Sequence, residues 1–405
     1  MKIAIIGGGP AGLRAAEVAA AGGASVTLFD AKASVGRKFL VAGRGGLNLT
    51  NSELRERFAS RYSGTSQPTG LWPSLISEFD SEALREWAAG LGVETFAAST
   101  GRVYPRELKA APLLRRWVQR LRELDVKFAM HHRWTGLTAG PPLQLHFQTH
   151  GQPHTVEADA VILALGGGSW PETGSDGTWT EIFSRLEIAI APLQPANCGW
   201  ESPWPAALLA AVEGQPLKNI IVRAGEMETA GELLITRYGL EGGALYHLAP
   251  TLRTMSEPAI RIDFKPTITV AQLVAKLGSV RRDFLAEARQ SWRLSDAAFF
   301  ILENFGKFDS AESLAGVVKS CPVPLTRPRP LAEAISSAGG VRWSELDDGL
   351  MLKKIPGVFI AGEMIDWEAP TGGYLIQGCF TTGNHAAYAA LGWLRSDERS
   401  RLSAN

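Results

Sequence analysis

Three closely spaced glycines near the start of the chain are the first residues whose spacing points to chemistry. Gly7 permits a tight turn, Gly9 lets a ligand approach the backbone, and Gly12 lets a helix pack closely against a strand. A diphosphate would bind the free N–H groups and the positive dipole end of that helix. Asp30 follows at the distance expected of an acid that accepts hydrogen bonds from ribose hydroxyls. The pattern predicts a dinucleotide site, although the three glycines alone are a weak signal.

The segments around these glycines supply the strand and helix that such a site requires. Residues 2–6 form an apolar run that predicts a buried strand, and residues 10–21 predict a helix that ends at two glycines. Residues 25–30 predict a second strand, which ends in the aspartate. Strand, helix and strand in this order build parallel sheets. A glycine-rich turn in an unrelated α/β protein is the alternative interpretation.

Two later segments favour FAD over NAD as the dinucleotide. Residues 159–165 predict a buried central strand that leads into three glycines, and residues 357–362 predict another buried strand that enters a glycine turn. Each segment brings backbone close to a long ligand, and similar segments occur in flavoproteins of the glutathione-reductase superfamily. There the second segment ends in an acid that holds the ribityl chain, a role that Glu363 or Asp366 would take here. The single complete fingerprint predicts no separate NAD(P)H domain.

A cationic, glycine-rich loop follows the predicted ribose acid. Arg37 and Lys38 would contact the FAD phosphates and the edge of the isoalloxazine ring, where positive charge stabilises anionic reduced flavin. A solvated basic turn is the alternative. Asn48, Thr50 and Asn51 would hydrogen-bond the ring or cap the next helix.

Further candidates lie along the rest of the chain. The glycine-rich segment 372–378 precedes a helix predicted over 383–396, and its N–H groups would face the flavin O2. Cys379 is interpreted as a small buried apolar residue. The adjacent pair His131 and His132 is expected at the surface, away from any ligand.

The overall composition excludes several classes of function. Basic and acidic residues number 41 each, so the chain has no overall charge that would favour nucleic acid or an anionic membrane. The 3 cysteines have neither metal nor dithiol spacing. No apolar stretch is long enough to cross a membrane, and the first residues do not form a signal peptide. We therefore expect a cytoplasmic protein without a metal site.

Several blocks of the sequence together form a specific pattern. They are residues 7–12, 36–38, 42–51, 101–105, 165–171, 173–177, 231–239, 361–367 and 372–374. These blocks resemble one family, the bacterial HI0933-like flavoproteins, which include aminoacetone oxidase and bile-acid-associated flavoproteins. The family usually has Ser-Gly-x-Gly-Arg-Cys-Asn-x-Thr-Asn in the block at 42–51. This chain has Ala42, Gly46 and Leu47 in place of the Ser, Arg and Cys, so it resembles a divergent branch that lacks a thiol near the flavin.

The resemblance implies an α/β fold with a Rossmann-like FAD-binding domain of the glutathione-reductase type. An insert with a β-rich, barrel-like part and a helical bundle would interrupt this domain. The sequence has a matching texture: short β-like pieces lie near 190–265, helical spacing follows over 268–320, and a proline-rich linker is predicted over 321–330. We expect the FAD-binding domain at 1–190 and 331–405, the β-rich insert at 191–267 and the helical insert at 268–330.

Motif and resemblance together give one set of residues expected to bind FAD. They are Gly7, Gly9, Pro10, Ala11, Gly12, Asp30, Ala31, Arg37, Lys38, Gly43, Gly45, Gly46, Asn48, Ala164, Leu165, Gly166, Gly167, Gly362, Glu363, Asp366, Gly373 and Tyr374.

The function implied is that of an FAD-dependent oxidoreductase that transfers hydride between flavin and a small organic substrate, with an unidentified electron donor or acceptor. No residue is identified as a general base, because the cofactor takes or gives the hydride and the protein supplies orientation and electrostatics. Two alternatives stay open. A flavin-dependent RNA-modifying or RNA-binding protein predicts a basic face near Arg281, Arg282 and Arg327. A non-catalytic flavin-binding protein predicts no turnover.

Overall fold

The computed structural model describes residues 1–43, 45–278 and 283–403, with side chains up to residue 396. Arg281 and Arg282, named above, and Arg44 within the resembling block 42–51 lie outside the described residues. The chain forms two compact units, each described by itself. We call the unit made of Met1–Gln194 and the chain from Ser336 onwards the terminal unit, and Pro195–Ile335 the insert.

A five-stranded parallel sheet is the centre of the terminal unit. In spatial order its strands are β19 (Val358–Ile360), β10 (Ala160–Leu163), β1 (Lys2–Ile6), β2 (Ser25–Phe29) and β6 (Lys127–Ala129). The central strands are buried on both faces, which explains why they appear in the sequence as continuous apolar runs. All carboxyl ends of these parallel strands meet at one edge.

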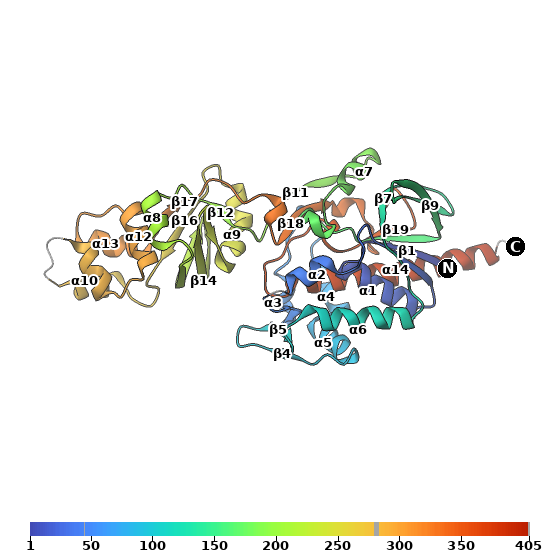
Figure 1. Ribbon diagram of the computed structural model, residues 1–405, viewed down its shortest axis with the longest axis horizontal. Coiled ribbons are helices and arrows are strands. Elements are labelled where there is room, and N and C mark those ends of the chain that lie inside the picture. The colour runs from blue at the N-terminus through green and yellow to red at the C-terminus, as the bar shows by residue number, and fades with distance from the viewer. Residues whose placement is uncertain (44, 279–282, 404–405) are drawn as a thin grey trace. The chain divides into compact units, whose positions relative to one another are not determined.

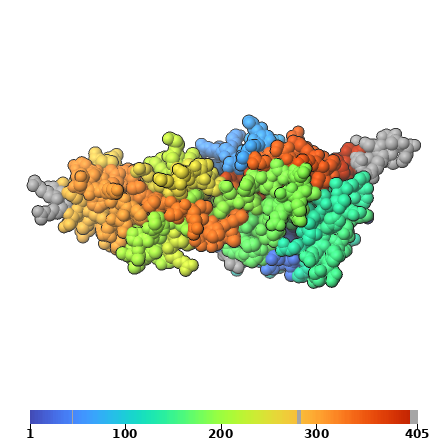
Figure 2. Space-filling view, turned by 90° about the horizontal axis from the view of Figure 1, so that it is seen from above, coloured from blue at the N-terminus to red at the C-terminus, as the bar shows by residue number. Residues whose placement is uncertain are grey.

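Two helices from opposite ends of the chain lie side by side along this sheet, α1 (Pro10–Ala21) and α14 (Tyr374–Ser403) (Figure 1). The helix predicted over 383–396 thus begins earlier, at Tyr374. The glycines taken for a turn include a packing position within this helix, because a Cβ added at Gly378 would lie 2.8 Å from the Trp367 ring. Figure 2 also shows early residues, in blue, beside late residues, in orange-red, on the surface of this unit.

Smaller elements complete the terminal unit. They include a three-stranded antiparallel sheet of β7, β8 and β9, in which β8 pairs with both of the others. The smaller elements of the terminal unit are α2 (Arg37–Ala42), β3 (Thr50–Asn51), α3 (Arg55–Ala59), α4 (Leu71–Glu78), α5 (Ser81–Gly90), β4 (Thr95–Ala97), β5 (Arg102–Pro105), α6 (Ala110–Glu123), β7 (His132–Thr138), β8 (Leu143–Thr149), β9 (Gln152–Ala158), η1 (Pro171–Thr173), α7 (Trp179–Arg185), β18 (Ser336–Val341), η3 (Trp343–Glu345) and η4 (Gly362–Met364). The strand β11 (Ile190–Ala196) begins in this unit and ends in the insert, and η2 (Leu331–Glu333) belongs to the insert.

The insert consists of a curled antiparallel sheet and helices. The helical texture predicted over 268–320 is confirmed by α10 to α13, whereas the β-like stretch before it also contains two helices, α8 and α9. The sheet order is β12 (Trp200–Glu201), β15 (Gly239–Glu241), β14 (Met227–Thr236), β13 (Pro216–Ala224), β16 (Ala259–Asp263), β17 (Cys321–Pro324). The helices are α8 (Ala206–Val212), α9 (Gly243–Thr254), α10 (Val270–Leu277), α11 (Phe284–Ser291), α12 (Asp296–Phe305) and α13 (Ala311–Lys319).

The prediction of a proline-rich linker over 321–330 was wrong. Residues 321–324 form β17, which pairs with β16 through partners such as Val323 and Ile260. β17 lies at the edge of the sheet, where a proline that cannot donate a hydrogen bond is tolerated. Proline content alone did not distinguish an edge strand from a linker.

A buried carboxylate joins three helices of the terminal unit. Glu17 on α1 accepts hydrogen bonds from the indole N–H groups of Trp87 on α5 (2.8 Å) and Trp117 on α6 (2.9 Å). Its other oxygen accepts one from Arg120 at 3.1 Å, and Arg14 lies 3.4 Å away. Glu17 is 6% exposed, so these partners replace water around its charge.

Glu17→Ala should lower the free energy of unfolding by about 3 kcal/mol, because it leaves two buried indole N–H groups and the Arg14 charge without their acceptor. Urea unfolding followed by tryptophan fluorescence measures the loss. The control Glu86→Ala, at an exposed position on α5, should change stability by less than about 0.5 kcal/mol. Equal effects of the two substitutions would contradict the prediction.

Among the helices of the described chain, none is both long enough and apolar enough to cross a membrane.

Candidate dinucleotide site

A cleft lies at the carboxyl edge of the parallel sheet. Its walls include residues at the ends of four strands: Ile6 at the end of β1, Asp30 after β2, Ala164 after β10 and Ala361 after β19. Open α/β sheets bind ligands at this edge. The predicted site residues that line it are Gly7, Gly9, Pro10, Ala11, Asp30, Ala31, Arg37, Lys38, Ala164, Leu165, Gly166, Gly362 and Glu363.

The three glycines of the first loop face different surroundings. A Cβ added at Gly12 would lie 1.9 Å from the carbonyl oxygen of Gly7, and one added at Gly7 would lie 2.2 Å from that of Ala164. Gly7 also has a φ of +106°. A Cβ added at Gly9 would meet nothing within 4 Å. Gly7 and Gly12 are therefore required by packing, whereas the free side of Gly9 leaves room for a ligand beside the start of α1.

Asp30 is held in place by two backbone groups. Its Oδ2 accepts a hydrogen bond from the N–H of Gly8 and its Oδ1 one from the N–H of Lys32, both at 2.8 Å. Burial raises the pKa of Asp30, and these hydrogen bonds oppose the rise. Carboxylate oxygens have further lone pairs, so a carboxylate fixed in this way fits the predicted ribose contact.

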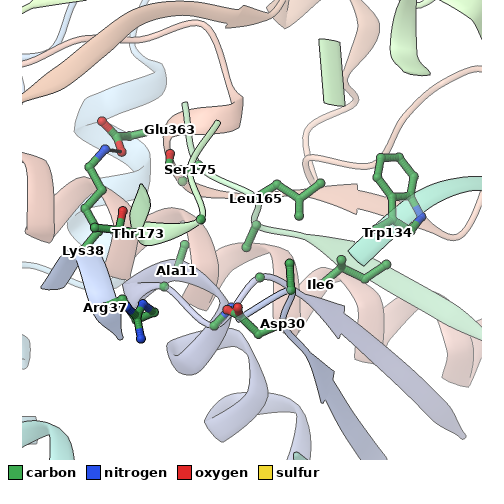
Figure 3. Close-up of a pocket in the computed structure, with 18 of the residues that line it drawn as sticks. Ile6, Ala11, Asp30, Arg37, Lys38, Trp134, Leu165, Thr173, Ser175 and Glu363 are labelled. Atoms are coloured by element: carbon green, nitrogen blue, oxygen red, sulfur yellow. Dashed lines mark hydrogen bonds and ion pairs between the residues drawn. The ribbon is translucent and has the colours of Figure 1, made fainter. Parts of the chain in front are cut away.

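An ion pair within the cleft joins segments from opposite ends of the chain. Lys38 Nζ lies 3.0 Å from Glu363 Oε2 and donates a hydrogen bond to Ser169 Oγ at 2.6 Å. Lys38 belongs to α2 and extends toward Glu363 of η4 (Figure 3). In that view Trp134 lies on the opposite side from this pair, with Asp30 between them. The cleft thus has an acid–base pair on one side and Asp30 nearer its middle.

A second group of predicted residues lies at the start of α14. In the amide orientation that satisfies its hydrogen bonds, Asn48 accepts one from the N–H of Gly373 (3.3 Å). Thr50 donates to Gln377 and Asn51 to the carbonyl of Gly372. The capping alternative for these residues was wrong, because Leu54 is the N-cap of α3. Segment 48–51 instead holds the glycine turn that begins α14.

The remaining predicted residues lie outside the walls of the cleft and serve packing or lie at the surface. Tyr374 donates its hydroxyl proton to Glu53 at 2.8 Å. A Cβ added at Gly167 would overlap the Ser337 hydroxyl, and one added at Gly43 would lie 2.5 Å from Ala110. Gly45 is exposed, and Gly46 lies beside the Tyr104 ring.

Asp366 is buried and does not line the cleft. Its backbone N–H bonds to Val341, and its carbonyl accepts from the Trp343 indole. Burial raises the pKa of Asp366 to about 6, against the opposing charge of Arg342 and hydrogen bonds from Thr65. Of the two acids considered for the ribityl chain, the geometry favours Glu363.

Sequence reasoning missed one wall of the cleft. His132, expected at the surface, lines it, whereas His131 is exposed as expected. Arg133 Nη1 lies 2.9 Å from Asp176 Oδ2, and both residues line the same wall. Trp179 donates to the carbonyl of Gly166 at 2.8 Å. Residues 173–177 belong to a resembling block, which was the available signal. Among the described residues no cluster of His, Cys, Asp and Glu could hold a metal ion.

Gly9→Ala should leave the fold intact and weaken FAD binding at least about tenfold, on the order of 1.4 kcal/mol, because its methyl group would occupy the ligand's side of the loop. Titration of FAD into flavin-free protein measures the affinity, and thermal unfolding of the flavin-free protein checks the fold. Gly12→Ala is the matched contrast: it should lower the melting temperature even without FAD. Unchanged FAD affinity in Gly9→Ala would contradict the assignment.

Asp366→Asn should stabilise the protein more at neutral pH than at acidic pH. With a folded-state pKa of about 6 against an ordinary value of 3.8, Asp366 contributes stability below about pH 4, and that stability is lost as the pH rises through about 6. The neutral amide removes the cost of the buried charge. Melting temperatures of wild type and variant should therefore differ most at about pH 7.5, approach each other as the pH falls below about 6, and converge only at about pH 4. A pH-independent difference would contradict this account.

Known proteins resemble this chain over nearly its whole length. The family described as HI0933-like protein Rossmann domain matches residues 1–389. The 3-dehydro-bile acid delta(4,6)-reductase of Clostridium scindens is 29% identical, over 96% of this chain and 98% of the relative. The ribosomal RNA dihydrouridine synthase of Escherichia coli is 20% identical, over 92% of this chain and 94% of the relative.

Among solved structures, the 3-ketosteroid-delta4-(5alpha)-dehydrogenase from Rhodococcus jostii RHA1 is similar in fold, with a TM-score of 0.53 and 14% identity. The match covers 96% of each chain. The fold, the cleft at the carboxyl edge of the sheet and the family match over residues 1–389 all indicate the same kind of protein. The chain belongs to the HI0933-like family, and it is an FAD-dependent oxidoreductase.

Proposed function

We propose that this oxidoreductase transfers hydride between flavin and a small organic substrate, and that this substrate contains a carbon–carbon double bond conjugated to a ketone. The observation that carries the proposal is the cleft itself, whose walls combine the glycine loop before α1, the carboxylate of Asp30 and the Lys38–Glu363 pair. The bile acid relative, by its name a delta(4,6)-reductase, supports the choice of substrate class.

The residues of the chain have separate tasks in this proposal. The loop at Gly9 holds the diphosphate, Asp30 holds the ribose, and the ion pair of Lys38 and Glu363 holds the ribityl chain. The bound flavin supplies or accepts the hydride. The N–H groups at the start of α14, fixed by Asn48, provide positive partial charge for the electron-rich edge of the ring.

The cysteines support hydride transfer without a thiol step. Burial raises the pKa of Cys198 to about 11 and that of Cys321 to about 12. Burial and the nearby charge of Glu363 raise the pKa of Cys379 still further. Thiols with such pKa values stay protonated at neutral pH and are poor nucleophiles. Leu47 stands where the family usually has a cysteine.

An anaerobic half-reaction tests the proposal. The protein is loaded with FAD, reduced with dithionite and mixed with a steroid-type ketone that contains a conjugated double bond. We expect the oxidised flavin spectrum to return as the double bond is saturated, while the matched ketone without the double bond has no effect. Cys379→Ala should react within about twofold of wild type. Failure of every conjugated ketone to reoxidise the flavin would overturn the substrate class, and reduction of oxidised flavin by aminoacetone would identify an amine oxidase instead.

The RNA alternative has support from the Escherichia coli relative, which by its name acts on ribosomal RNA. The charge of the insert does not add to that support. Residues 195–335 contain 15 basic and 15 acidic residues, so the insert has no net charge that would attract a polyanion. The small-molecule function is therefore preferred.

A further inference from the structure

A groove in the insert gathers positive charge that its own acids do not neutralise. It runs between the sheet and α12, and its walls include Lys265, Arg293 and Lys218. Glu232 is the one acid among the described residues that line it. On β14, Glu232 lies opposite the bulge of β13 that contains Lys218, because Gly231 and Leu233 pair with the residues on either side of that bulge. Glu232 is therefore placed to offset the positive charge of Lys218. The charges of Lys265 and Arg293 then have no further acid among the described residues that line the groove.

Lys265 and Arg293 are held close together. The ammonium group of Lys265 donates to the backbone carbonyl of Arg293 at 3.0 Å. Burial lowers the pKa of Lys265, and the charges of Lys276 and Arg293 lower it further. The nearby carboxylate of Asp263 is already occupied, since it accepts from the Lys265 backbone N–H and pairs with Lys319 at 2.7 Å. The charges of Lys276 and Arg293 thus both repel that of Lys265, in a module whose total charge is balanced.

Neutral hydrogen-bond donors lie in the same groove. Asn219 lines it at the bulge of β13 and has a φ of +55°. Thr267 and Ser295 add hydroxyl groups. Ser295 is the N-cap of α12, so the positive end of that helix also lies at the groove, although Asp296 in its first turn pairs with Arg289. Cations combined with hydroxyl and amide donors are the partners that phosphate oxygens require.

We propose that this groove binds a phosphate group, with Lys265 and Arg293 as its charged ligands and Lys276 as an outlying cation. Binding would relieve the repulsion among these three side chains. The phosphate would belong to a free phosphorylated molecule or to a phosphodiester backbone, and the two sources share this chemistry. The proposal is independent of the proposed function, since it concerns none of the residues of the dinucleotide cleft.

Calorimetric titration of the full-length, FAD-loaded protein tests the proposal, because bound FAD prevents the probe from entering the dinucleotide cleft. The probes are inorganic pyrophosphate and a single-stranded RNA oligonucleotide. The variant Lys265→Gln/Arg293→Gln should weaken binding of at least one probe by about tenfold or more. The control Lys307→Gln removes an exposed cation of the insert outside the groove and should leave binding unchanged. Thermal unfolding checks that each variant is folded.

Lys276→Gln gives a second test that leaves the groove walls in place, and it should weaken the same probe about two- to threefold. A response to pyrophosphate alone would identify a free phosphorylated ligand. A salt-sensitive response to RNA would identify a phosphodiester backbone. The proposal is overturned if wild type binds neither probe at millimolar concentration, or if Lys307→Gln weakens binding as much as the groove variants do.

Discussion

Close contact between backbone atoms at the start of α1 is the constraint on which the terminal unit depends. A side chain at Gly12 would collide with the carbonyl of Gly7, and one at Gly383 of α14 would lie 2.3 Å from the carbonyl of Ala11. The strand β1, the helix α1 and the final helix therefore meet without intervening side chains. Because β19 pairs beside β10, the sheet also combines strands from both ends of the sequence.

The same close contact determines where the groups that line the cleft lie. With side chains excluded from the contact, the N–H groups of α1 stay open to the cleft, and the segment after β19 brings Glu363 against Lys38. Segment 48–51 then fixes the start of α14 through Asn48. In the proposed site, Lys38 and Glu363 are already bonded to each other, so little reorganisation of these charges would be required when the cofactor binds.

The sequence predicted the parts of this arrangement that depend on local pattern. The strand at 2–6, the helix at 10–21 and the role of the glycine loop as a wall of the cleft follow from apolar runs and glycine spacing. The features that the sequence did not predict depend on tertiary contacts. The wall formed by Arg133 and Asp176 joins residues from different elements, and no periodicity marks it. The edge strand at 321–324 was mistaken for a linker because only the neighbouring strand shows why its prolines are tolerated.

A crystal structure of the protein with FAD would show whether the cofactor lies in this cleft and in which direction. We expect the diphosphate against Gly9 and the first N–H groups of α1, the adenosine ribose at Asp30, and the ribityl chain beside Glu363 and Lys38. FAD bound in the reverse direction, with its ring system beside Asp30, or bound outside this cleft, would contradict this expectation.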